Sequence, residues 1–204
     1  MERFVLLLIG GPFLLLGLAF GLWVSPSMRQ EAADLALMAP ATAAQLSDMA
    51  AGSRVLLEGH LSGRNRAYYQ GYVAYIVDEC HTDSDGDTDC DEVERVTPPL
   101  RLNASGGPVQ IINQDYDLSG DIPIYYQDPF EDTGLKGEEA VIVLGALAPP
   151  DGEPKVRADY IAPGSQADQI AYLRSEATIL LILGAIFGLI GAGLTAIGIV
   201  VLIR

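Results

Sequence analysis

Two apolar stretches without a charged residue lie near opposite ends of this 204-residue chain, at residues 4–24 and 177–203. At about 1.5 Å per helical residue, the first stretch reaches roughly 31 Å, the thickness of a bilayer's hydrocarbon core. The chain is 50% hydrophobic and still carries a formal net charge of −15. The two properties therefore belong to different segments, which predicts two membrane-spanning helices joined by an acidic, water-facing region.

This division predicts five parts. They are a first transmembrane helix at 1–25, a helical linker at 26–51, a β domain at 52–164 with an acidic loop at 78–94, a helix at 165–176, and a second transmembrane helix at 177–204. A cleaved signal peptide is the alternative for the first span. The length of the span, the single Arg3 before it and the lack of an A-x-A pattern after it favour an uncleaved anchor.

Two spans place both chain termini on the same side of a membrane. Arg3 and Arg204 flank the spans, and the positive-inside rule then favours the cytoplasm for both termini. We expect a multi-pass protein of the cell membrane with its central domain outside the cytoplasm. The spans themselves contain no ionisable residue, which argues against transport, because transporters and proton relays need such groups within the membrane.

Small residues recur along one face of each span. Close backbone approach at such residues is what allows helices to associate in lipid. We therefore expect tight contacts of the two spans with each other or with other membrane-protein subunits. The residues concerned are Gly10, Gly17 and Gly21 in the first span, and Gly184, Gly188, Ala192 and Ala196, spaced by four, in the second.

The region between the spans has the alternating pattern of short β-strands, at 52–61, 68–77, 98–102, 108–113, 137–147 and 156–161. Gly59 and Gly145 interrupt two of these patterns, and glycines so placed mark bends where a small sheet curls. The expected fold class is membrane-anchored and mainly β: a small OB-like, partly open β-barrel between two transmembrane helices, with short flanking helices. A small β-sandwich is the alternative.

The order of these motifs resembles a known family. A span is followed by a strand ending in E-G-x-L, an aromatic-rich strand, an acidic insert, the segment TPPLRLNASGGPVQI, the strand GEEAVIVLGAL, the turn IAPGS and a final span. This is similar to the GIDE-type (beside-a-membrane) domain of mitochondrial membrane-anchored ubiquitin ligases and their prokaryotic relatives. The resemblance covers residues 53–204 and implies a β-rich domain next to a membrane. Those ligases carry a RING after the second span, whereas this sequence ends at Arg204, so it does not imply ligase activity.

The acidic loop follows part of the pattern of a calcium-binding loop. With Gly86 at the sixth position, four aspartates occupy positions three, five, seven and nine, and a glutamate occupies position twelve. His81 stands at position one, where an aspartate is expected, and the alternative is a solvated acidic hairpin tip. The possible calcium ligands are Asp83, Asp85, Asp87, Asp89 and Glu92.

Cys80 and Cys90 bracket this loop and are the only cysteines in the chain. In an extracytoplasmic compartment, such a pair predicts a disulfide that closes the hairpin. The alternative is a Cys/His metal site that includes His81, but it lacks a fourth ligand.

The remaining sequence favours binding over catalysis. The strong negative charge argues against a nucleic-acid partner. His60 has no nucleophile or second histidine near it in the sequence, which makes a surface position the better interpretation, and no small-molecule substrate is evident. The leading hypothesis is a non-enzymatic membrane protein whose β domain contacts other proteins, as an accessory subunit of a larger membrane complex. The alternative is a calcium-binding or calcium-stabilised module.

Overall fold

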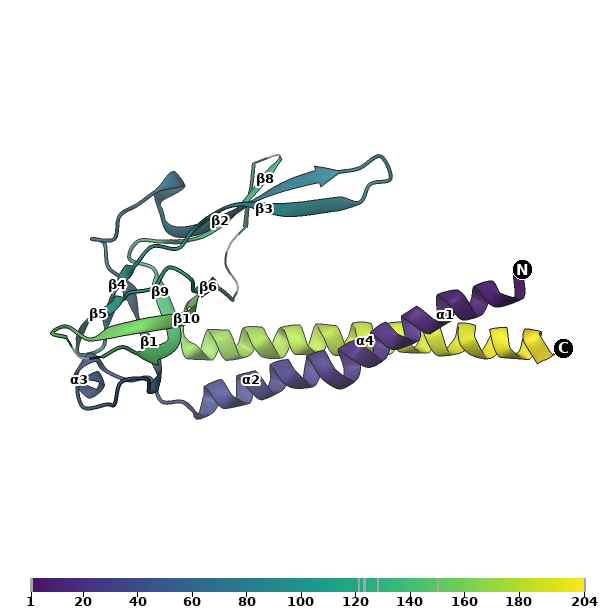
Figure 1. The fold of residues 1–204 in the computed structure, drawn as a ribbon, viewed down its shortest axis with the longest axis horizontal. Helices are drawn as coiled ribbons and strands as arrows, with labels where there is room; N and C mark the ends of the chain where they lie inside the picture. The colour runs from purple at the N-terminus through teal and green to yellow at the C-terminus, as the bar shows by residue number, and fades with distance from the viewer. Residues whose placement is uncertain (1, 121, 123, 128, 150, 204) are drawn as a thin grey trace. The chain divides into compact units, whose positions relative to one another are not determined.

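The computed structural model describes residues 2–120, 122, 124–127, 129–149 and 151–203, so Arg204 lies outside the described residues. The chain forms two compact units. One unit contains both ends of the chain, up to Leu37 and from Ile170, and is helical; the other is Met38–Gln169 and is mainly β (Figure 1).

The N-terminal helix does not stop at the end of the apolar stretch. Helix α1 (Glu2–Ala19) continues through a π-helical turn, η1 (Phe20–Val24), into α2 (Ser25–Leu37). The predicted boundary between the first span (1–25) and the helical linker (26–51) falls at Pro26, and in a regular α-helix a proline ring clashes with the carbonyl four residues earlier. The wider turn removes this conflict: the Ser25 N–H donates to the Phe20 carbonyl, five residues back.

The C-terminal helix α4 (Gln166–Ile203) is likewise continuous over 38 residues. It joins the polar helix predicted at 165–176 to the apolar segment after it. Within the described residues, two helices are long and apolar enough to cross a membrane, Leu8–Leu37 and Gln166–Val200, as judged by length and composition.

The N-terminal helix and α4 pack together through glycine backbones. A Cβ atom at Gly17 would overlap the backbone of Gly184 and Gly188, and one at Gly184 would lie 2.9 Å from the Gly21 nitrogen. Gly10 lies in the same way against Thr195. The two helices therefore approach at distances that no larger residue permits at these positions.

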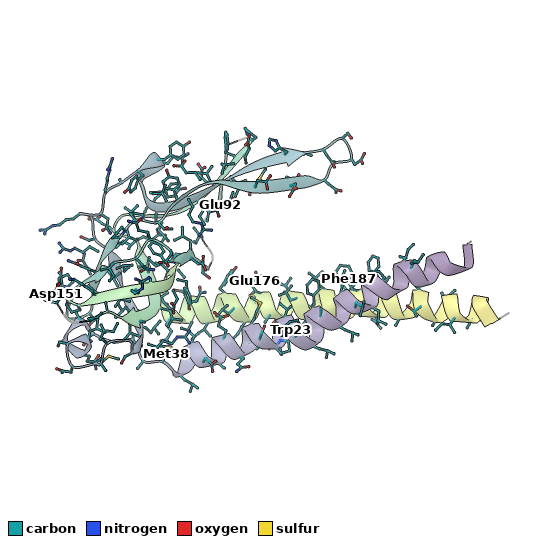
Figure 2. All side chains as sticks on the ribbon, viewed as in Figure 1. Trp23, Met38, Glu92, Asp151, Glu176 and Phe187 are labelled. Carbon is teal, nitrogen blue, oxygen red and sulfur yellow. A yellow bond between two sulfur atoms is a disulfide. The ribbon has the colours of Figure 1, made fainter. Side chains whose placement is uncertain are left out.

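Further contacts extend this glycine seam along both helices. A Cβ at Gly191 would overlap the Leu14 backbone, and Phe187 lies where the helices cross, 5.6 Å from Phe13 between ring centroids (Figure 2). At the other end of the seam, the buried Ser25 hydroxyl donates to the Ala177 carbonyl at 2.8 Å.

The seam on α4 follows residues 184, 188, 191 and 195 rather than the predicted spacing of four. These positions are separated by four, three and four residues. Alternating steps of four and three average 3.5 residues, so the contacting residues stay on one face of the helix. A strict four-residue step drifts by about 40° each time at 3.6 residues per turn. Ala192 and Ala196, which were expected in the contact, are accordingly exposed.

The β unit contains a closed five-stranded barrel, where the sequence predicted a partly open one. The strands follow the order β5-β4-β1-β9-β10, and parallel pairing of β10 with β5 closes the ring at Lys155–Gln110 and Val156–Ile111. A short strand, β6 (Asp117–Leu118), adds to β10. The barrel strands are β1 (Arg54–Leu61), β4 (Leu100–Ala104), β5 (Gly107–Ile111), β9 (Ala140–Leu147) and β10 (Lys155–Pro163).

Two glycines allow the barrel strands to approach one another closely. A Cβ at Gly59 would overlap the Asn103 carbonyl of β4, and a Cβ at Gly145 would overlap the Arg157 carbonyl of β10, next to a register shift in that strand. The core of the β unit is mostly aliphatic and includes the fully buried Leu57, with Tyr116 as an aromatic member.

A second sheet packs against the barrel, with strand order β3-β2-β8-β7. Its inner face contributes Val73, Ala74 and Leu135 to the barrel core. The sequence did not predict β3, because nearly all of its residues are exposed and show no apolar alternation. The remaining elements are α3 (Ala43–Leu46), the 3₁₀ turn η2 (Tyr69–Gly71), β2 (Tyr72–Thr82), β3 (Thr88–Val96), β7 (Ile124–Gln127) and β8 (Phe130–Lys136).

The glycine seam makes a specific prediction for α4. Gly191→Ile should lower the free energy of unfolding of the detergent-solubilised chain by about 1–3 kcal/mol, because the new side chain overlaps the Leu14 backbone. Gly193→Ile is the matched control, since a Cβ there meets open space. Titration with a denaturing detergent, followed by circular dichroism, measures both. Equal effects of the two substitutions would contradict the seam.

Candidate functional site

The acidic loop is part of a long β-hairpin closed by a disulfide. Strands β2 and β3 pair from Tyr75–Val96 to Thr82–Thr88, and the predicted Cys80–Cys90 bond joins them across one rung. Pairing with β8 reaches only to Glu79, so the hairpin continues beyond the rest of the sheet (Figure 1).

The cysteines do not form a metal site here. The two sulfur atoms and a carboxylate oxygen of Glu131 lie within 4.8 Å of one another, but the disulfide occupies both sulfurs. His81, the other ligand considered, lies 3.8 Å from Glu79 and is largely exposed.

Hydrogen bonds of Asp83 organise the hairpin tip. Its Oδ1 accepts the backbone N–H groups of Asp85 and Asp87, at 2.9 and 3.1 Å. Gly86 has a φ of 88°, which suits a glycine in the turn. The Thr82 and Thr88 hydroxyls lie 3.0 Å apart just below the tip.

The five possible calcium ligands are distributed between the tip and β3. Asp89 and Glu92 belong to the strand, and Glu92 pairs with Arg95, whose Nη2 lies 2.6 Å from its Oε2. The hydrogen bond from Arg95 lowers the pKa of the Glu92 carboxyl. A calcium ion would have to compete with Arg95 for Glu92 and with the turn for Asp83. Calcium binding stays a prediction.

The outer face of the second sheet brings together groups that are distant in the sequence. Val77 pairs with Glu94 on one side and with Asp132 on the other. Residues directly opposite in an antiparallel ladder point to the same face, so both carboxylates flank Val77.

Tyrosines adjoin this rung. Tyr75, which is 4% exposed, donates its hydroxyl hydrogen to Glu94 Oε1 at 2.8 Å. Burial, followed by this hydrogen bond to a carboxylate, raises the pKa of Tyr75 to about 12. The Tyr75 ring lies 6.2–6.5 Å from those of Tyr68, Tyr69 and Tyr72.

Asp132 is a buried carboxylate, with 2% of its surface exposed. Its Oδ2 accepts a hydrogen bond from Gln70 Nε2 at 2.9 Å, and Gln70 itself has a φ of 52°. Desolvation raises the pKa of Asp132 above its ordinary value.

Glu94 and Asp132 line a cavity of about 390 Å³, which we call the outer cleft. Sequence reasoning identified the tyrosine-rich strand next to it but missed the residues from β3 and β8, because their pairing with β2 is not readable from the sequence. The lining residues are Tyr69, Val77, Val93, Glu94, Phe130 and Asp132.

A second cavity, of about 360 Å³, lies beside His60 and includes Glu58, Ser165 and Asp168. Its polar groups have structural roles. The Ser165 N–H and hydroxyl both donate to Asp168 Oδ2, at 2.8 and 2.7 Å, which caps the start of α4. His60 is exposed, as the sequence predicted. This arrangement gives Ser165 a capping role.

No protein-family model matches the chain, and no curated protein matches its sequence.

The buried charge of Asp132 predicts a pH-dependent stability difference. Its raised pKa means that folding favours the protonated form, so this favourable contribution is present at low pH and is lost as the pH rises through the raised pKa. Asp132→Asn keeps an acceptor for Gln70 and removes the charge. The variant should have a higher melting temperature than the unmodified chain at pH 7, and the difference should vanish near pH 3.

Thermal melts from pH 3 to pH 8 measure this difference. Asp85→Asn is the control, because it removes one charge from the exposed tip. An Asp132→Asn variant that melts at or below the temperature of the unmodified chain at pH 7 would contradict the desolvation argument.

Proposed function

We propose that this chain is a non-enzymatic, two-span membrane protein whose β unit contacts other proteins outside the cytoplasm, as an accessory subunit of a larger membrane complex. The paired apolar helices support the anchoring role. Their lack of ionisable residues between positions 4–24 and 177–203 favours anchoring over transport. Both termini are proposed to be cytoplasmic.

We assign the barrel to the OB type. In chain order its strands are β1, β4, β5, β9 and β10, and the ring order places the third beside the fifth and the first beside the fourth. Such a Greek-key arrangement of five strands is characteristic of OB-folds. Together with the motif order between residues 53 and 204, it supports membership of the GIDE-type family as a hypothesis.

One observation carries the contact function: the hairpin exposes nearly the whole of β3. A bare edge strand is a liability in a soluble domain, and proteins usually cover it or place charges on it. Here the edge is both charged and extended past its neighbours, with the Cys80–Cys90 disulfide tying its two strands together. Such a pre-ordered projection loses little conformational entropy when it binds a partner.

Co-purification tests this function. The tagged full chain, extracted from native membranes in a mild detergent, should carry membrane proteins in stoichiometric amounts, identified by mass spectrometry. A variant in which an Asn-Gly turn replaces residues 80–90, the part of the hairpin that projects past β8, should lose them while its barrel melts unchanged. Isolation of the chain alone, or full retention of partners by the shortened variant, would contradict the proposal.

A further inference from the structure

Exposed apolar side chains gather at one place on the β unit. Among the described residues of 38–169, four large apolar side chains are exposed: Tyr69, Val93, Ile112 and Phe130, with exposures of 48, 51, 37 and 39%. All except Ile112 line the outer cleft. Single exposed apolar residues are normal on a protein surface, but a group of them around a cavity indicates a binding site.

The charged groups of the cleft are both carboxylates. Glu94 and Asp132 lie on either side of Val77, two strand spacings apart, which is about 10 Å between backbones. Asp132 is almost completely buried, whereas Glu94 is exposed. A cationic side chain seated over Val77 would lie between the two carboxylates.

The surrounding sheet strengthens this negative field. Strands β2, β3 and β8 contain two fixed cations, Arg95 and Lys136. Arg95 pairs with Glu92, and the Lys136 ammonium lies 5.6 Å from the Tyr72 ring centre. The same strands contain eight carboxylates: Asp78, Glu79, Asp89, Asp91, Glu92, Glu94, Glu131 and Asp132.

We propose that the outer cleft binds an arginine- or lysine-rich segment of a partner protein, with one cationic side chain seated between Glu94 and Asp132. The aliphatic stem of that side chain packs against Val77, Val93 and Phe130, since long basic side chains bury their methylenes while keeping the charge among polar groups. This inference rests on the proposed contact function and gives the chemistry of the partner.

A protein segment fits this surface better than a single small cation does. On the face of the cleft, the carboxylates continue along β3 through Asp91 and Asp89, which pair with Glu79 and His81, two and four residues after Val77 in β2. An extended basic segment matches this row, because complementary charges along an interface fix orientation and speed association.

Binding of a defined probe tests the inference. The full chain in nanodiscs of zwitterionic lipid is titrated into fluorescein-labelled octa-arginine, and anisotropy is measured with empty nanodiscs as background. Glu94→Gln should weaken binding about two- to fivefold, the range of a partly exposed ion pair. Glu131→Gln is the matched control: it removes the same charge one residue from Asp132, beside the disulfide. It should weaken binding less than twofold.

A second pair of variants tests the apolar contacts of the cleft. Val93→Ser should weaken binding about threefold through lost contact with the aliphatic stem, and Ile112→Ser, at the exposed apolar residue outside the cleft, should not. Equal effects within either pair would overturn the inference. So would displacement of octa-arginine by millimolar phosphocholine, which would assign the cleft to a lipid headgroup.

These outcomes are separate from those of the co-purification experiment. If partners co-purify and depend on the hairpin while Glu94→Gln and Glu131→Gln behave alike, the cleft proposal fails and the contact function stands. If octa-arginine binds selectively at the cleft but nothing co-purifies, the accessory-subunit proposal fails instead.

Discussion

The backbone contact between the N-terminal helix and α4 is the constraint on which this architecture depends. Glycines at 17, 184 and 191 leave no room for a side chain, so the helices meet at van der Waals distance along the seam. In lipid there is no hydrophobic driving force between helices, because the lipid tails are as apolar as the side chains. Close packing of this kind is then a main source of helix association. Within the β unit, a hydrogen bond joins the two ends of the segment: the Gln166 side chain donates to the Met38 carbonyl at 2.7 Å.

Within the β unit, the closed barrel and the second sheet have different roles. The barrel pairs its five strands around a ring, which leaves no free edge among them, and it encloses a mostly aliphatic core. The second sheet is inserted between barrel strands and contains the hairpin, the disulfide and the outer cleft. Exposed apolar groups and uncompensated carboxylates therefore collect on the part of the fold that the barrel does not need for its own closure.

Several features were predictable from local sequence patterns. The strand patterns at 52–61 and 137–147 correspond to β1 and β9, and the hairpin disulfide is present. These strand and disulfide predictions were correct because apolar alternation and a pair of nearby cysteines can be recognised within a short stretch of sequence. The continuous N-terminal helix was not predicted, since a π-helical turn leaves no residue pattern that outweighs Pro26. The departure from a four-residue seam reflects the geometry of two crossing helices.

The outer cleft was beyond sequence reasoning for a similar cause. Glu94 and Asp132 are 38 positions apart and meet only because both of their strands pair with Val77. Strand β3 has no apolar alternation to reveal it, and the bulge beside Val77 shifts which of its side chains share a face. The composition of the outer cleft therefore depends on long-range strand pairing and register, which are properties of the whole sheet.

The central proposal is that two paired spans anchor the acidic β unit outside the cytoplasm, and the native lysines allow this proposal to be tested without substitutions. The chain has two lysines, Lys136 and Lys155, both in the β unit. A membrane-impermeant, amine-reactive biotin reagent is applied to intact cells, and the labelled positions are mapped by mass spectrometry. The account predicts labelling of both lysines in intact cells and labelling of the Met1 amine only after lysis. Lysines that react only after lysis would contradict it.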